Sequence, residues 1–489
     1  MREKIKQLTK DTALYGISTM VGRFLNFLLV PFYTNIFQPA DYGVVTNLYA
    51  LIALLNIIFL YGLDSAYLKF AASDDFSDKK KVFSSAFITL FFTSLLFTGI
   101  LLASGNAINK LFAVTEQYSY LLTYTGFILL FDALSALPFI YLRVARRAGK
   151  FSAIKITNIV LTIILNIILI VVLKKGIEAV FISNLVASVV TFLILLPDIF
   201  SQLKFQIDRD VLQRLMKFGF PYLPGGIAAM FMQVIDRPIV EYLTDLKTLG
   251  IYQANYKLGI FMMLFVSMFQ YAWQPFSLQY AKDKDAKELF SKVFTLFTVV
   301  GSLILLFLSL FINDIATFSI GGKSLIGEAY WSGLSIVPII LAGYLFNGFY
   351  FNFSAAIYIK EKSSIVPLLM GAGAATNVAV NFMLIPIFNI TGAALATLLS
   401  YVVMAVGFYF VSQKHFPVNY EWRKIGKTFF LLGIVAFLFY SIHFYGAVEF
   451  FYKTFLLLLF LGGLFGLNII PKNEIVLIKN ILLRKKINE

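Results

Sequence analysis

Long apolar runs, separated by short polar breaks, repeat along almost the whole chain. From Thr12 to Pro471, about 20 or more mostly apolar residues are followed each time by a break. Each run is long enough to cross the ~30 Å hydrocarbon layer of a membrane as a helix. The pattern predicts fourteen transmembrane spans, near residues 12–36, 43–68, 82–104, 117–142, 152–173, 177–197, 217–243, 249–275, 288–312, 331–357, 364–387, 391–412, 427–445 and 453–470.

Basic residues lie mostly at the two termini and in every second break, which gives the chain two distinct sides. Lys79–Lys81 and Lys282–Lys287 lie in such breaks, and Lys174–Lys175 is a local exception on the opposite side. Lys and Arg concentrate in cytoplasmic loops of membrane proteins. We therefore expect a multi-pass protein of the bacterial inner (cytoplasmic) membrane with both termini in the cytoplasm.

Composition narrows the classes of function. The chain is 59% hydrophobic, with a net charge of +15 that is spread over many loops. Such spread charge suits anionic lipid headgroups and predicts membrane lipids, not nucleic acid, as partners. With no cysteine and only His415 and His443, no metal site, cofactor or histidine-based catalytic group is expected. No loop exceeds roughly twenty residues, so we expect no soluble catalytic domain and no enzyme.

An internal repeat predicts two lobes. The segment Asp41–Tyr49, which opens the second span, resembles Thr248–Tyr256, which opens the eighth, with Gly43 aligned to Gly250. Because each copy contains six spans, the copies keep one orientation and relate by an axis along the membrane normal. The expected fold is all-α integral membrane: an N-lobe of spans 1–6 and a C-lobe of spans 7–12 around a central cavity, with two extra C-terminal helices. The corresponding boundaries are 1–200, 201–216, 217–412 and 413–489.

The segment 201–216 is the expected cytoplasmic linker between the lobes. It is followed by the seventh span and contains Val211, Leu212, Leu215 and Met216 at helical spacing. Apolar residues at this spacing beside basic ones are typical of a short helix at a membrane surface.

Three cations lie at depths where charge is costly. Arg23 is midway through the first span, Arg237 is in the seventh, and Lys257 is two turns into the eighth. Buried ionisable groups normally face a cavity or a partner. One interpretation places all three in a cavity that binds an anionic group, for which the planar arginine fork is suited. The other pairs the arginines with acids such as Asp132, Asp236 or Glu241.

Acidic residues and prolines within the spans leave further alternatives open. Asp64, Asp132 and Asp236 are candidates either for ion coupling or for pairing within the membrane. Pro31 and Pro238 are candidate hinges, since proline interrupts helical hydrogen bonding. They are separated by the same offset as Gly43 and Gly250, which supports a bend shared by the two copies.

Several motifs resemble one known family. The run Gly22–Gly43, the segment Lys217–Gly225 followed by Asp236–Arg237, and Thr391–Thr397 with Ser400 are similar to signatures of bacterial polysaccharide-transport proteins. These are oligosaccharide flippases of the multidrug/oligosaccharidyl-lipid/polysaccharide exporter superfamily.

The resemblance implies a fourteen-helix transporter that moves an undecaprenyl-pyrophosphate-linked oligosaccharide from the cytoplasmic to the outer leaflet by alternating access. Such a protein would serve O-antigen, capsule or exopolysaccharide synthesis, with polymerase and chain-length proteins of the same pathway as expected partners. Arg23 and Arg237 match positions of the family pattern. Coupling to H⁺ or Na⁺ is expected for the superfamily. A lipid-linked peptidoglycan-precursor flippase and a cation-coupled multidrug exporter stay open as alternatives.

Overall fold

The chain is almost entirely helical. The computed structural model describes residues 22, 24–25, 27–73, 76–105, 116–360 and 365–469. Within these ranges, eleven helices are long and apolar enough to cross a membrane, which makes this a multi-pass membrane protein. The first part of the predicted span 12–36, residues 12–21, and also Arg23, lie outside the described residues. The count of fourteen therefore stays a prediction.

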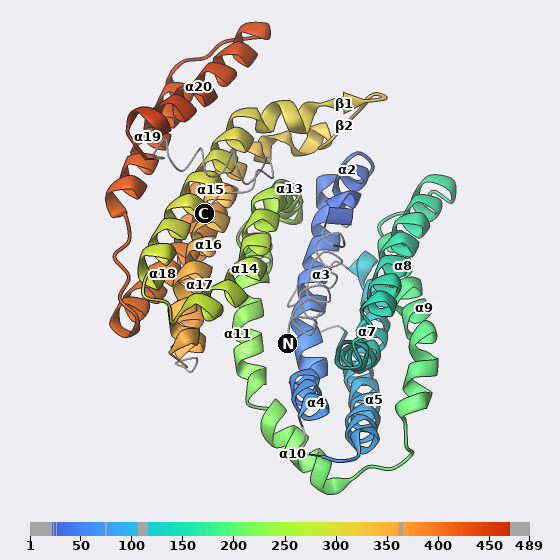
Figure 1. Cartoon of the computed structure of the whole chain (residues 1–489). Coiled ribbons are helices and arrows are strands. Elements are labelled where there is room, and N and C mark those ends of the chain that lie inside the picture. The colour runs from blue at the N-terminus through green and yellow to red at the C-terminus, as the bar shows by residue number, and fades with distance from the viewer. Residues whose placement is uncertain are drawn as a thin grey trace. The chain divides into compact units, whose positions relative to one another are not determined.

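Two compact units make up the fold. The first unit contains the chain up to Ile260 together with Ser319–Ile336 and Val366–Ser400. Its helices up to the linker are α2 (Leu29–Thr34), α3 (Pro39–Leu60), α4 (Leu63–Ala72), α5 (Lys79–Ala103), η1 (Glu116–Tyr118), α7 (Leu121–Val144), α8 (Ala148–Ile167) with the π-helical turn η2 (Ile168–Val172), and α9 (Glu178–Gln202). It continues with α10 (Arg209–Gly219), α11 (Tyr222–Val234), α12 (Asp236–Leu243), α13 (Leu246–Tyr256), the 3₁₀ helices η3 (Lys257–Gly259) and η4 (Glu328–Ile336), and α17 (Val366–Phe388). Helices α3, α5, α7, α8 and α9 pack side by side (Figure 1).

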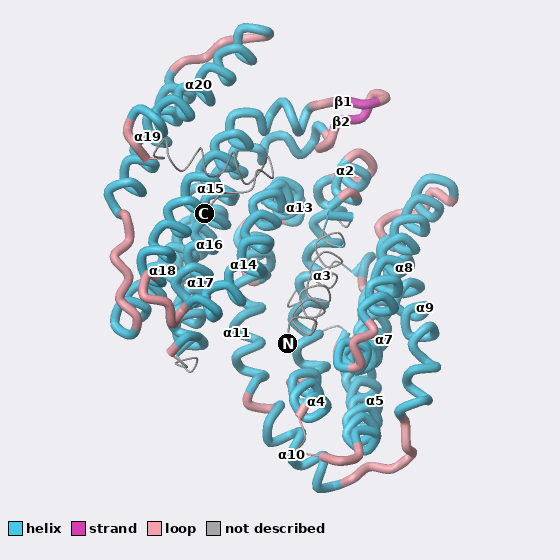
Figure 2. The backbone as a smooth tube through the Cα atoms, in the orientation of Figure 1, coloured by secondary structure: helices cyan, strands magenta, loops and turns pink. Residues whose placement is uncertain are grey.

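The second unit contains Phe261–Phe318, Val337–Ile365 and the chain from Tyr401 onward. Its helices are α14 (Ile260–Tyr280), α15 (Ala286–Thr317), α16 (Val337–Ile359), the C-terminal part of α18 (Ile390–His415), α19 (Trp422–Ser441) and α20 (Ala447–Gly466). Helices α15, α19 and α20 share a buried apolar cluster centred on Val435, Leu456 and Phe460. The only strands among the described residues, β1 (Ser319–Ile320) and β2 (Lys323–Ser324), form a small hairpin in the first unit, as Figure 2 shows.

Several predicted spans are not single α-helices. The span 217–243 divides at Ile235 into α11 and α12, and 249–275 is formed by α13, η3 and α14. The span 43–68 divides into α3 and α4 because Tyr61 and Gly62 adopt positive φ angles of 33° and 81°. Gly62 meets the backbone carbonyl of Gly219, where a side chain would overlap it. The glycine therefore provides both the turn and the close approach.

The two segments that the sequence aligned as repeat copies contact one another at their matching glycines. Helices α3 and α13 cross so closely that a Cβ atom on Gly43 would overlap the carbonyl oxygen of Leu246. A Cβ atom on Gly250 would likewise overlap the carbonyl oxygen of Pro39. We call this contact the α3–α13 crossing. Small residues allow such close backbone packing between membrane helices.

The segment Ser319–Ile336 holds the neighbouring α2–α3 turn. The Gly327 N–H donates to Thr34 Oγ1 at 3.1 Å, and Asn35 Nδ2 donates to the carbonyl of Ser324 at 2.7 Å. The buried Tyr330 hydroxyl donates to the carbonyl of Phe37 at 2.9 Å. These bonds satisfy backbone groups at a helix end, where intrahelical partners are lacking.

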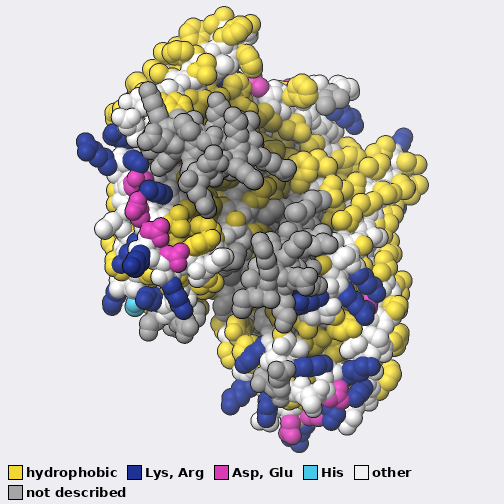
Figure 3. All heavy atoms as spheres, viewed as in Figure 1, with side chains coloured by type: hydrophobic (Ala, Val, Ile, Leu, Met, Phe, Trp, Pro, Cys, Tyr) yellow, Lys and Arg dark blue, Asp and Glu magenta, His cyan; other side chains and the backbone are white. Residues whose placement is uncertain are grey.

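The linker helix α10 packs on protein. Val211 and Leu215 are buried in an apolar cluster with residues of α4 and α5, while Leu212 and Met216 are half-buried. In Figure 3, Lys and Arg side chains gather at the end of the first unit that carries α10. Hydrophobic side chains cover much of the remaining surface of that unit in this view.

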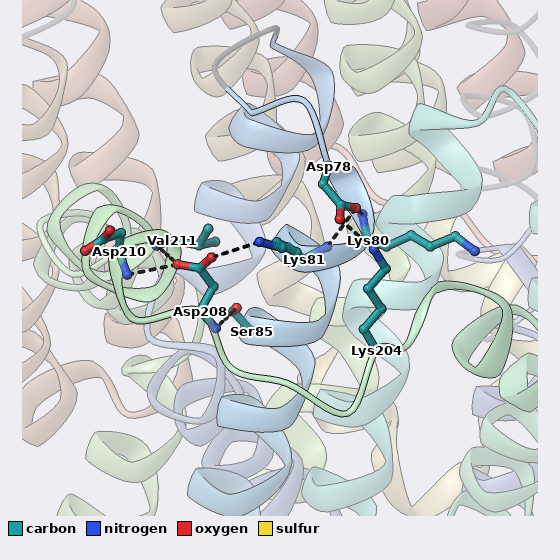
Figure 4. A network of polar contacts seen from close by, with 8 residues as sticks. All are labelled: Asp78, Lys80, Lys81, Ser85, Lys204, Asp208, Asp210 and Val211. Carbon is teal, nitrogen blue, oxygen red and sulfur yellow. Dashed lines mark hydrogen bonds and ion pairs between the residues drawn. The ribbon is translucent and has the colours of Figure 1, made fainter.

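A polar network attaches the linker to the start of α5 (Figure 4). Lys204 Nζ donates to Asp78 at 2.6 Å, and Lys81 pairs with Asp208 at 3.6 Å. The Asp208 carboxylate also accepts from the backbone N–H groups of Asp210 and Val211, which caps α10. The Ser85 hydroxyl accepts from the backbone N–H of Asp208.

This network predicts that acid loosens the linker. The Lys204 ammonium lowers the pKa of Asp78, and the Val211 N–H, followed by Lys81, lowers the pKa of Asp208. Each of these carboxyls has a lower pKa in the folded chain than in the unfolded chain, where the pKa is near 3.9. It therefore stabilises the fold at pH values above the unfolded pKa. This stabilisation is lost as the pH falls through the pKa of the folded chain. Hydrogen exchange in 202–211, corrected for intrinsic rates, should therefore rise below about pH 4. The variant Asp78→Asn/Asp208→Asn should show the faster exchange already at pH 7; unchanged exchange in both tests would contradict the role of these charges.

A buried lysine joins α20 to α15. Lys453 is 1% exposed, and its ammonium lies 2.6 Å from both Asp314 and Glu449. Replacing it with Met leaves two carboxylates without their cation, so we expect a loss of about 2–3 kcal/mol, reduced from the fully buried case because both acids are partly exposed. Thermal unfolding of the purified protein measures the change. The control Lys175→Met removes an exposed ion pair with Glu178 and should lower the stability by less than about 1 kcal/mol. Equal losses of stability in the two variants would contradict a special role for the buried Lys453.

Candidate functional site

A cavity of about 400 Å³ within the first unit collects polar side chains from helices far apart in the sequence. We call it the cationic cavity. It is lined by Leu29, Tyr33, Tyr42, Val45, Thr46, Tyr49, Asn158, Thr162, Asn184, Arg237, Gln253 and Lys257. Its volume falls within the range of small-molecule binding sites.

Two cations and an amide offer hydrogen-bond donors to this cavity. Lys257 Nζ donates to the Tyr42 hydroxyl at 3.0 Å and lies 5.4 Å from the centroid of that ring. Arg237 Nε and Gln253 Nε2 are buried, and neither has a hydrogen-bond partner among the described residues. An unpaired buried donor is costly, and a ligand with acceptor oxygens would relieve that cost.

Tyrosines and amides form the rest of the polar wall. Asn184 Nδ2 donates to the Tyr49 hydroxyl at 2.8 Å, and the Tyr33 hydroxyl donates to Asn166 Oδ1 at 2.9 Å. The Tyr49 ring stacks on Phe181 with centroids 5.7 Å apart. These bonds fix the side chains in place before any ligand arrives.

The structure brings Arg237 and Lys257 together, as the cavity interpretation expects. Neither forms an ion pair with a carboxylate of the described residues, and no described residue lining the cavity is acidic. Arg237 does interact electrostatically with the adjacent Asp236, so the alternative in which it pairs with an acid stays open. The role of all three cations in substrate binding stays a prediction, and Arg23 lies outside the described residues.

The three acids predicted to couple an ion or to pair within the membrane lie apart from one another. Asp236 is 4% exposed and accepts from the Tyr252 hydroxyl at 2.7 Å. Asp132 lines an adjoining polar cavity, and Asp64 lies in the first turn of α4 beside a third pocket. Among the described residues, no group of three or more His, Cys, Asp or Glu side chains is placed to hold a metal ion. Ion coupling stays a prediction.

The two candidate hinge prolines lie near helix ends. Pro31 is within the short helix α2, and Pro238 is in the first turn of α12, three residues after the division at Ile235. Proline has no N–H to continue the helical hydrogen bonds, which agrees with the division three residues before Pro238; the hinge role stays a prediction.

Several cavity residues were missed by sequence reasoning. Tyr33, Tyr42, Thr162 and Gln253 were not identified because tyrosines and neutral polar residues are common in membrane helices. Lys155, which lines the adjoining cavity, carried a clearer signal, since it lies near the start of the predicted span 152–173. An intramembrane cation is a functional candidate by default.

Comparisons with known proteins agree with this architecture. The profile of a family described as "Polysaccharide biosynthesis protein" matches residues 34–300, which is more than half of the chain. No curated protein sequence matches the chain.

Solved structures share the fold. The lipid II flippase MurJ in an inward closed conformation has 16% sequence identity and a TM-score of 0.73, covering 91% of this chain and 97% of that one. An inward-facing multidrug resistance MATE family transporter of the MOP superfamily has 13% identity and a TM-score of 0.68, covering 83% and 97%. An outward-facing transporter of the same description has 14% identity and a TM-score of 0.56, covering 83% and 95%.

Proposed function

Because the chain belongs to the polysaccharide biosynthesis protein family, we propose that it is a flippase for an undecaprenyl-pyrophosphate-linked oligosaccharide. It would move this lipid from the cytoplasmic to the outer leaflet of the inner membrane by alternating access. The observation that carries the proposal is the cationic cavity, where Arg237 and Lys257 face the same space and Arg237 Nε lacks a described partner.

The cavity suits the head of such a lipid. A diphosphate presents several anionic oxygens, which the arginine fork can bind in a bidentate way and the lysine ammonium as a point charge. Gln253, Asn158 and Asn184 offer amide groups that can bond to sugar hydroxyls. The apolar tail would stay in the bilayer, since the cavity is too small and too polar for it.

The multidrug alternative fits this cavity less well. A cationic drug would be repelled by two cations in a space where the described lining offers no carboxylate. The peptidoglycan-precursor alternative is closer, since such a lipid also carries an anionic head. Measuring both lipids and drug sensitivity in a deletion strain distinguishes the oligosaccharide lipid, the peptidoglycan precursor and a drug as substrates.

A deletion strain tests the proposal. We would measure lipid-linked oligosaccharide, lipid-linked peptidoglycan precursor and surface glycan, with leaflet location determined by access of an impermeant glycan-modifying enzyme. Oligosaccharide accumulating on the cytoplasmic side, with surface glycan lost and restored by wild type but not by Arg237→Gln, is the expected result. Trapped peptidoglycan precursor would instead favour the second candidate. Normal leaflet distribution of both lipids with altered drug sensitivity would overturn the flippase proposal.

A further inference from the structure

A second polar cavity adjoins the cationic cavity inside the first unit. It has a volume of about 380 Å³, lies among α3, α7, α8 and α9, and shares Asn158 and Asn184 with the cationic cavity. We call it the neutral-polar cavity, because amides and hydroxyls make up most of its polar lining. A ligand that reaches from one cavity into the other would pass these two asparagines.

The polar groups of the neutral-polar cavity are partly preorganised and partly free. Ser188 Oγ donates to Asp132 Oδ1 at 2.7 Å, and Asn158 Nδ2 donates to Thr191 Oγ1 at 2.9 Å. Ser135 Oγ is buried without a hydrogen-bond partner among the described residues. The cavity therefore offers a carboxylate, two cations (Arg143 and Lys155), amides and a free hydroxyl, which together both donate and accept.

Charge and size argue against a bare cation as the occupant. Lys155 interacts electrostatically with Asp132, and its ammonium lies 4.2 Å from the centroid of the Phe139 ring. A cation beside Asp132 would meet this positive charge. The volume is also roughly ten times the ~30 Å³ that one water occupies in the liquid. The cavity is thus sized for a small organic group.

A sugar ring matches this lining. Its hydroxyls both donate and accept hydrogen bonds, which fits a mixed set of carboxylate, amide and hydroxyl groups. Its apolar C–H face could lie on an aromatic wall, where Phe139 and Phe151 pack edge to face with centroids 5.3 Å apart. An acyl chain would leave the polar groups unsatisfied.

We propose that the neutral-polar cavity is a binding subsite for a sugar ring of the transported lipid-linked oligosaccharide. The inference rests on the proposed flippase function. The first sugars follow the diphosphate directly, so a diphosphate at Arg237 and Lys257 would place a sugar within reach of Asn158 and Asn184. Specificity for the glycan would then come from Asn56, Ser135 and Asp132. Arg237 and Lys257 would recognise the diphosphate, which all such lipids share.

Two lipid probes separate the subsite from the cationic cavity. The purified full-length protein in nanodiscs is titrated with undecaprenyl diphosphate that carries no sugar, and with the undecaprenyl-diphosphate-linked oligosaccharide extracted from the deletion strain. Wild type should bind the oligosaccharide form more tightly. The variant Asn56→Leu/Ser135→Ala should lose about tenfold or more of its affinity for that form, since two hydrogen-bonding groups are removed. Its affinity for the sugar-free lipid should stay within about twofold, which also shows that the variant is folded.

Control variants make the outcomes distinct. Ser94→Ala removes another buried serine hydroxyl without a described partner, from α5 and outside both cavity linings, and should bind both probes as wild type does. Arg237→Gln should weaken both probes. If the double variant binds the oligosaccharide form like wild type, or loses both probes equally, the subsite is overturned while the flippase proposal stands. If wild type binds neither probe, both proposals are overturned.

Discussion

Replacing Arg237 with Gln is expected to lower the rate of oligosaccharide translocation by about 10- to 100-fold, the range that follows from losing a charge-assisted hydrogen bond of about 1.5–3 kcal/mol. The effect should be large because Arg237 Nε is buried in the cationic cavity without a described partner. In the proposed function, that donor is satisfied only when the anionic head of the lipid is bound. The measurement is translocation of the extracted lipid-linked oligosaccharide in proteoliposomes, with protein amount and orientation determined for each sample.

Two further variants separate charge from geometry. Arg237→Lys should recover only part of the rate, because an ammonium keeps the charge but lacks the planar fork that binds two oxygens at once. Arg209→Gln removes the same charge from the exposed start of α10 and should translocate like wild type. A wild-type rate in Arg237→Gln, or an equal loss in Arg209→Gln, would contradict a specific role for the cationic cavity.

Sequence reasoning predicted the membrane helices well because their signal is physical and local. An apolar run of about 20 residues has few alternatives to a membrane-spanning helix. The division of the span 43–68 escaped prediction because its break depends on a contact distant in sequence. Gly62 alone does not indicate a turn; the turn becomes evident only when Gly219 lies against it. The division at Ile235 did have a local signal, because Pro238, the candidate hinge of that span, lies three residues later and cannot donate a helical hydrogen bond.

The candidate site was predictable in its charges but not in its neutral residues. Arg237 and Lys257 stood out because charge inside a membrane is rare. Tyr42, which accepts the Lys257 hydrogen bond, and Gln253 resemble many other residues of the chain and become notable only through their position. Lys155 shows a different failure, since its charge near the start of the predicted span 152–173 was visible in the sequence but was not considered as a candidate.

The internal repeat stays a prediction, but its two aligned glycines meet in the structure. The sequence aligned Gly43 with Gly250, yet it could not show that these glycines lie at one contact between α3 and α13. A repeat shows that two segments share a local structure, whereas their mutual contact depends on how the copies pack. Small residues at matching positions of two copies are nevertheless suited to meeting on a pseudo-symmetry axis.

The α3–α13 crossing leads to the second large expected effect: Gly250→Ala should destabilise the protein by about 1–3 kcal/mol, the usual cost of overpacking. In a helix without such a contact, alanine would instead stabilise by up to about 1 kcal/mol. Here the added methyl overlaps the carbonyl oxygen of Pro39, so the two helix backbones must separate. The measurement is thermal unfolding of the purified protein. Gly371→Ala in α17 is the matched control, since its Cβ atom would enter open space.

The same substitution should also expose the buried turn beside the crossing. Thr34 is 4% exposed and accepts the Gly327 hydrogen bond, and the chain has no natural cysteine to interfere with labelling. In a Thr34→Cys background, Gly250→Ala should raise the rate of modification by a bulky thiol reagent, whereas Gly371→Ala should not. In the proposed function, the transport cavity opens to each side of the membrane in turn, so a substitution that forces α3 and α13 apart should also slow translocation. Unchanged stability together with unchanged labelling would contradict the predicted overlap at the α3–α13 crossing.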